Sequence, residues 1–171
     1  MTATLRARLA ECPLKGFALA LYARPGIESA CLRLQDEAGV DVCELLWRCW
    51  LLQLGLEPDV QATVELAEIR HWQHRVTLPL RRLRRSLKTE ALARPGVAKV
   101  RETLKRAELE AELETLARLE ELAWQGPLLP LSAGGGKSAE YLADSLQLQK
   151  KSHLSTLGTV IDCLDPPPGP R

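Results

Sequence analysis

Apolar side chains cover nearly every side of one stretch of the chain, residues 41–54 (DVCELLWRCWLLQL). Its only polar residues are Asp41, Glu44, Arg48 and Gln53. A helix with so little polar surface has to be enclosed by other elements, because one covered face would leave Leu and Trp side chains in water. The pattern therefore predicts a buried central helix.

Both ends of this helix carry recognisable signals. Asp41 can cap the first turn, and Glu44 lies three residues later, as in a capping box. Val40 and Leu45 have the spacing of a hydrophobic staple, and Gly55 can end the helix. At ~1.5 Å per residue, the helix would be about 21 Å long, roughly the width of a small domain.

Helical spacing of apolar residues recurs before and after the central helix, separated by short Pro- and Gly-containing connections. The expected flanking helices lie at about 13–23, 26–39, 59–72, 77–88, 97–125, 138–150 and 157–164. We expect Thr77 to cap a new helix, with Pro79 in its first turn, and residues 1–12 to be a frayed lead-in. The helix at 97–125 would span about 43 Å, so part of it should project or bend.

The fold class that follows is all-α. No stretch alternates apolar and polar residues with enough β-branched side chains to predict a strand. We expect one domain over 1–164, a bundle of about six to eight helices around the central helix 41–54. Pro and Gly predict a flexible loop at 126–137, and DPPPGPR at 165–171 predicts a disordered tail.

The segment 17–50 carries a series of short motifs: Phe-x-Leu-x-Leu-Tyr, Pro-Gly, Cys-Leu-x-Leu-Gln-Asp and Gly-x-Asp-Val, followed by Leu-Leu and Trp. In these motifs it resembles an uncharacterised bacterial family of all-helical proteins of unknown function. Trp72 and the segment 79–85 (PLRRLRR) look similar as well. The resemblance covers about half of the chain and implies a helical fold, but no activity that can be carried over.

Composition adds little to this picture. Hydrophobic residues make up 46% of the chain, charged residues 26%, and the net charge is +1, as in an ordinary soluble protein rather than a polycation. Five cysteines without CxxC spacing favour reduced, buried thiols over a disulfide scaffold. We find no signal peptide and no apolar run long enough to cross a bilayer, so the expected location is cytoplasmic.

Charge is distributed unevenly. From Arg75 to Arg106 there are eleven Lys or Arg residues and two acids, whereas 108–121 contains six Glu and one Arg. A basic helix can present guanidinium groups to phosphates or to an acidic partner. The candidate binding residues are Arg81, Arg82, Arg84, Arg85 and Lys88. The favoured alternatives are that this helix packs antiparallel against the acidic segment, or is simply solvated. The segment has no aromatic residue to stack a base.

For the other candidate sites we favour a structural role over a functional one. Asp36 is a candidate functional carboxylate, or else an ion-pair partner of Arg33 or a helix-end residue. His71-x-x-His74 has metal-ligand spacing on a helix but no evident third ligand, so no metal site is expected.

For two further features we also favour a structural role over a functional one. The segment 134–138 (GGGKS) has Leu131 where a phosphate loop needs glycine, which favours a linker. Cys31 would need a neighbouring base to be a nucleophile, so a small buried thiol is the preferred interpretation.

These observations rank three function classes. The first is a non-catalytic protein–protein interaction or adaptor module, whose partner is another protein or a second copy of itself. The second is binding of nucleic acid or another polyanion through the basic helix 75–88. The third is a helical-bundle enzyme, which would need a pocket with convergent polar groups. The sequence predicts no catalytic residue, no cofactor and no membrane association.

Overall fold

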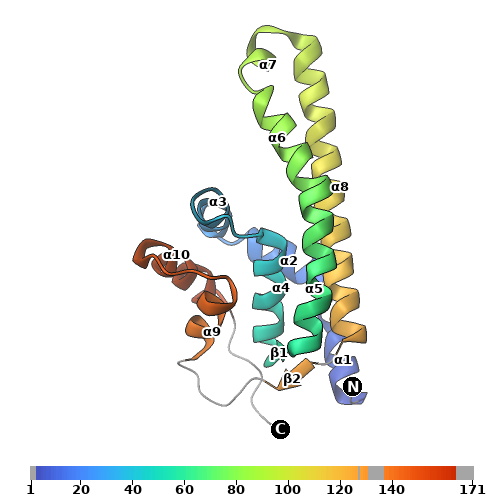
Figure 1. Ribbon diagram of the computed structural model, residues 1–171, viewed down its shortest axis with the longest axis vertical. Helices are drawn as coiled ribbons and strands as arrows, with labels where there is room; N and C mark the ends of the chain where they lie inside the picture. Colours follow the sequence, from blue (N-terminus) through green and yellow to red (C-terminus); the bar gives the residue numbers. More distant parts are fainter. Residues whose placement is uncertain (1–2, 127, 131–136, 165–171) are drawn as a thin grey trace.

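The computed structural model describes residues 3–126, 128–130 and 137–164, which form an all-α domain with one small sheet (Figure 1). The predicted fold class is thereby confirmed. The helices are α1 (Ala3–Glu11), α2 (Leu14–Tyr22), α3 (Ile27–Ala38), α4 (Val42–Gln53), α5 (Val60–Trp72), the π-helical turn η1 (Gln73–Thr77), α6 (Leu78–Ser86), α7 (Glu90–Ala93), α8 (Pro95–Gln125), α9 (Lys137–Ser145) and α10 (Lys151–Ile161). The strands are β1 (Leu56–Pro58) and β2 (Leu128–Pro130).

Helix α4 is buried at every position from Cys43 to Leu52, as the sequence predicts. It is enclosed by α2, α3, α8 and β1. Trp47 and Trp50 have no exposed surface, and the indole Nε1 of Trp50 donates a hydrogen bond to the carbonyl of Cys12. Burial of its side chains, worth about 1.5–3 kcal/mol for each Leu, makes α4 a large contributor to hydrophobic stabilisation.

The predicted start and end of α4 are present, with one correction. The Asp41 carboxylate accepts a hydrogen bond from the Glu44 N–H at 3.0 Å, and Gly55 adopts a left-handed backbone with φ of 66°. The Glu44 carboxylate, however, is bonded to arginines of α4 and α5. The capping box is therefore half formed, because ion pairing takes the Glu44 side chain away from the helix start.

Three predictions made from the sequence are wrong: those for the lead-in, for the loop at 126–137 and for Thr77. Residues 3–11 form α1, whose Leu9 is buried, where a frayed lead-in was expected. Part of the expected loop at 126–137 is β2, which pairs antiparallel with β1 so that Glu57 faces Leu129. Three-residue strands are too short to show a period-two pattern. Residues 127, 131–136 and 165–171, including most of the expected loop, the GGG run and the expected tail, lie outside the described residues.

The third correction concerns Thr77. It caps no helix: its backbone is right-handed helical, and α5, η1 and α6 follow one another without a break from Val60 to Ser86. Pro79 has no N–H to complete an α-helical ladder, and the π-helical turn ends two residues before it. Together with α7 and α8 these elements make a long helical hairpin (Figure 1).

The far end of this hairpin projects from the rest of the domain, as the predicted length of α8 suggests (Figure 1). We call residues 78–107, which comprise α6, α7 and the first part of α8, the hairpin arm. None of these residues is buried, although nearly all are helical. Along the described residues, no helix combines the length and apolar character needed to cross a membrane.

Candidate functional site

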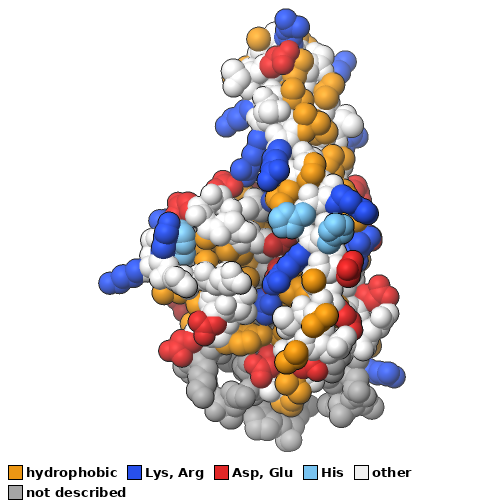
Figure 2. All heavy atoms as spheres, viewed as in Figure 1, with side chains coloured by type: hydrophobic (Ala, Val, Ile, Leu, Met, Phe, Trp, Pro, Cys, Tyr) orange, Lys and Arg blue, Asp and Glu red, His pale blue; other side chains and the backbone are white. Residues whose placement is uncertain are grey.

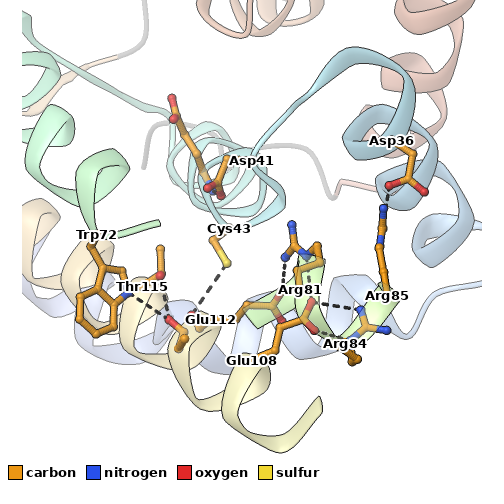
Figure 3. Close-up of polar contacts among 12 residues, drawn as sticks. Asp36, Asp41, Cys43, Trp72, Arg81, Arg84, Arg85, Glu108, Glu112 and Thr115 are labelled. Atoms are coloured by element: carbon orange, nitrogen blue, oxygen red, sulfur yellow. Dashed lines mark hydrogen bonds and ion pairs between the residues drawn. The ribbon is translucent and has the colours of Figure 1, made fainter. Parts of the chain in front are cut away.

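Helices α6 and α8 pack against one another, and the basic residues of α6 meet the acidic residues of α8 (Figure 3). Arg81 donates from Nε to Glu108 at 2.8 Å and also pairs with Glu112. Arg84 pairs with the same Glu108 carboxylate. Of the alternatives that the sequence leaves open for these two arginines, the antiparallel packing of basic on acidic helix is the one observed.

The two remaining arginines of the candidate set differ from each other. Arg85 donates to the Asp36 carboxylate at 2.8 Å, and this joins α6 to α3 (Figure 3). The pair brings together two residues that the sequence considers separately. Arg82 and Lys88 are exposed and have no ion-pair partner among the described residues. They are the members of the candidate set that are free to bind another molecule.

The paired acids of α8 have shifted pKa values. Burial alone would raise the pKa of Glu108, but hydrogen bonds from Arg84 and Arg81 outweigh it and hold the pKa below its usual value. For Glu112 burial prevails over Arg81, so that its pKa is raised. Glu108 is thus firmly ionised at neutral pH and binds α6 electrostatically.

A second ion cluster, not anticipated from the sequence, lies at the centre of the fold. Glu44 of α4 accepts hydrogen bonds from Arg48, one turn later, and from both Nε and Nη2 of Arg70 on α5. Burial opposes ionisation of Glu44, but the two arginines more than compensate and its pKa is lowered. The i, i+4 spacing of Glu44 and Arg48 is visible in the sequence; the contribution of Arg70 requires the tertiary fold.

The histidine candidates lie on the surface, and the cysteine candidate is buried. His71 and His74 are exposed, and no group of three or more potential metal ligands occurs in the described part of the chain. All five cysteines are free thiols, and burial raises the pKa of Cys31 to about 11. A thiol of that kind is a poor nucleophile at neutral pH.

Two recesses border the hairpin arm. One is a mostly apolar groove of about 580 Å³ between α2, α3 and α8, with the half-exposed leucines Leu19, Leu32 and Leu109 in its lining. The other is a polar pocket of about 500 Å³ that lies near the start of α4 and includes Arg70 and Arg82. Both volumes fall within the range of small-molecule pockets, roughly 300–1,000 Å³.

A family model described as "Protein of unknown function (DUF2390)" matches residues 14–119, which is more than half of the chain. The chain belongs to this family. The resemblance of segment 17–50 to an uncharacterised family is thereby confirmed. No curated protein and no solved structure matches the chain.

The DUF2390 match contains most of the features described above. It runs from α2 into the second half of α8 and therefore includes the central helix, the arm and both ion clusters. Strand β2 and helices α9 and α10 lie beyond it. The α4 core and the projecting arm thus belong to the family region, and α9 and α10 are packed beside it.

Proposed function

We propose that this protein is a non-catalytic interaction module that binds a protein partner through the hairpin arm. The observation that carries the proposal is the arm itself: 78–107 has no buried residue, yet it extends the hairpin well beyond the core. Helices without a buried residue add little to the stability of the fold, because helical stability in proteins comes mostly from tertiary packing. Such a projection is suited to contact with another molecule.

Exposed apolar side chains on the arm support a protein partner. Leu92 at the tip is 87% exposed, and Val100 and Leu83 are each at least half exposed. Hydrophobic side chains appear along much of the arm in Figure 2. Contiguous apolar surface of this kind marks interaction sites in soluble proteins, because leaving it in water is unfavourable.

The charge of the arm indicates the chemistry of the partner. The arm contains ten Lys or Arg residues and two Glu. Three of the arginines, Arg81, Arg84 and Arg85, are paired with acids outside the arm. The remaining seven cations exceed the two acids, so a partner with acidic residues around an apolar centre would complement the surface.

Site-specific photo-crosslinking in the native cell tests this function. A photoreactive amino acid at Leu92 should capture a discrete protein, and Lys88→Glu in the same chain should reduce the yield. The matched control is Val64 on α5, an exposed apolar residue away from the arm. A band at twice the mass of the chain identifies the partner as a second copy. The proposal is wrong if Leu92 gives no adduct, or the same adducts as Val64.

Polyanion binding is the second candidate, favoured by one observation: Arg82 and Lys88 are exposed and without ion-pair partners among the described residues. Charge reversal of both should abolish retention on heparin at low salt. Charge reversal of Arg85, which is neutralised by Asp36, should have a smaller effect. Absence of any salt-sensitive retention of the wild type eliminates this candidate.

A further inference from the structure

The polar pocket of about 500 Å³ lies where the hairpin arm meets the rest of the domain. Its lining comes from α3, the start of α4, α5, η1, α6 and residues 145–147. Figure 2 shows Lys and Arg side chains gathered along the junction between the hairpin and the part that carries α3, α9 and α10. The pocket therefore joins segments far apart in the sequence and has a strongly polar wall.

Three guanidinium groups belong to this wall: Arg70, Arg81 and Arg82. Two of them are held in place by carboxylates, Arg70 by Glu44 and Arg81 by acids of α8 that are not part of the lining. Arg82 has no ion-pair partner among the described residues. A free guanidinium beside two fixed ones provides planar, directed donors that suit the oxygens of a carboxylate or phosphate.

The same lining also offers acceptors. Gln73 in the π-helical turn is only 6% exposed and lines the pocket, and its Oε1 atom has no hydrogen-bond partner among the described residues. Asp41, whose pKa is raised mainly by burial, is also part of the lining. Both residues also line a small cavity between α4, α5 and α8. A buried amide oxygen without a donor is unfavourable, and π-helical turns recur at functional sites.

We propose that this pocket binds a small molecule with a carboxylate or phosphate group at one end and an N–H or O–H donor at the other. The anionic group binds Arg82 next to Arg81, and the donor reaches Gln73 or Asp41. Asp41 would repel an anion at its own end, which fixes the orientation of the ligand. This site is separate from the proposed docking function, because it requires neither the tip of the arm nor a protein partner.

Titrations followed by amide NMR test the site, with malate as the carboxylate probe and inorganic phosphate as the phosphate probe. One of them should shift the amides of 39–44, 73–82 and 145–147 in a saturable manner. Arg82→Gln should weaken that binding about tenfold, as expected for loss of a charge-assisted hydrogen bond. The matched control is Arg75→Gln, which removes the same charge from an exposed arginine outside the lining and should leave affinity unchanged.

A second variant, Gln73→Leu, distinguishes ligand binding from packing. Removal of the amide, whose Oε1 has no partner among the described residues, should preserve the fold, while malate or phosphate binding falls. Equal weakening by Arg75→Gln and Arg82→Gln would show general attraction of anions and overturn the proposal. Absence of saturable shifts around the pocket with both probes overturns it as well. Arg82 is exposed, so its variant should fold even if Gln73→Leu does not.

Discussion

The ion cluster around Glu44 provides the most demanding test of this structure. In Glu44→Gln the side chain keeps its shape but loses the charge that two arginines share. The side chain of Arg48 is 4% exposed, whereas that of Arg70 is 46% exposed. Arg70 can therefore turn to water when the carboxylate is removed, but Arg48 remains as a buried, unpaired cation.

The expected loss of stability follows from that difference. Removing one member of a buried ion pair costs about 3–5 kcal/mol, because the other charge is left uncompensated. This is a large part of a total of about 5–15 kcal/mol for a domain. At about 2–4 °C per kcal/mol for a chain of this size, the melting temperature should fall by about 6–20 °C.

The effect should depend on pH in a defined direction. The pKa of Glu44 is lower in the folded protein than its usual value, since the arginines outweigh the effect of burial. Its stabilising contribution is therefore fully present above the unfolded pKa of about 4.3 and is lost as pH falls through the folded pKa. The stabilities of wild type and Glu44→Gln should accordingly converge on acidification.

Urea unfolding followed by circular dichroism measures these differences. The control is Glu114→Gln, which breaks an exposed ion pair with Arg118 of the same i, i+4 spacing and should cost about 0–1 kcal/mol. Adding Arg48→Met to Glu44→Gln should recover much of the loss, because no buried charge remains. Similar losses for Glu44→Gln and Glu114→Gln, or no recovery in the double variant, would refute the reasoning.

Three other outcomes can be measured by the same unfolding assay. Leu46→Ala in the buried α4 should cost about 2–5 kcal/mol, and Leu19→Ala at an exposed position far less; equal midpoints would mean that the core is misplaced. Thr77→Val should be neutral or stabilising, since the buried hydroxyl has no partner among the described residues; a large loss would reveal one. Arg81→Ala should cost more than Arg85→Ala, because Arg81 and its acids are far less exposed; the reverse order would contradict the electrostatic picture.

The central helix could be predicted because its signals are local. The apolar surface of 41–54, the Asp41 cap and Gly55 all act within a few residues of one another, and the structure contains each of them. The start of the helix predicted at 59–72 is local in the same way, because the Asp59 carboxylate caps α5 by accepting from the Ala62 N–H. These features require no knowledge of how distant segments meet.

The errors arise where a residue's role depends on a distant partner. Glu44 has the position of a capping-box residue, but Arg70 lies 26 positions later and forms a stronger, charged interaction with it. Strand β2 exists only because β1 offers it a hydrogen-bonding edge. The pairing of Asp36 with Arg85 likewise joins residues 49 positions apart. The residues around Asp36 therefore could not show whether it pairs with Arg85 or with its neighbour Arg33.

The π-helical turn η1 sets which face of α6 meets α8. A π-helical turn takes up about one residue more than an α-helical turn, so everything after it is rotated. Deleting a single residue between Gln73 and Thr77 would restore regular α-helix and leave α6 facing nearly as it does now, whereas winding the same five residues as regular α-helix would swing α6 by about 100°, the rotation per residue of an α-helix. Arg81 and Arg84 would then point away from Glu108. The five residues of η1 therefore determine whether the arginines of α6 can form ion pairs with α8.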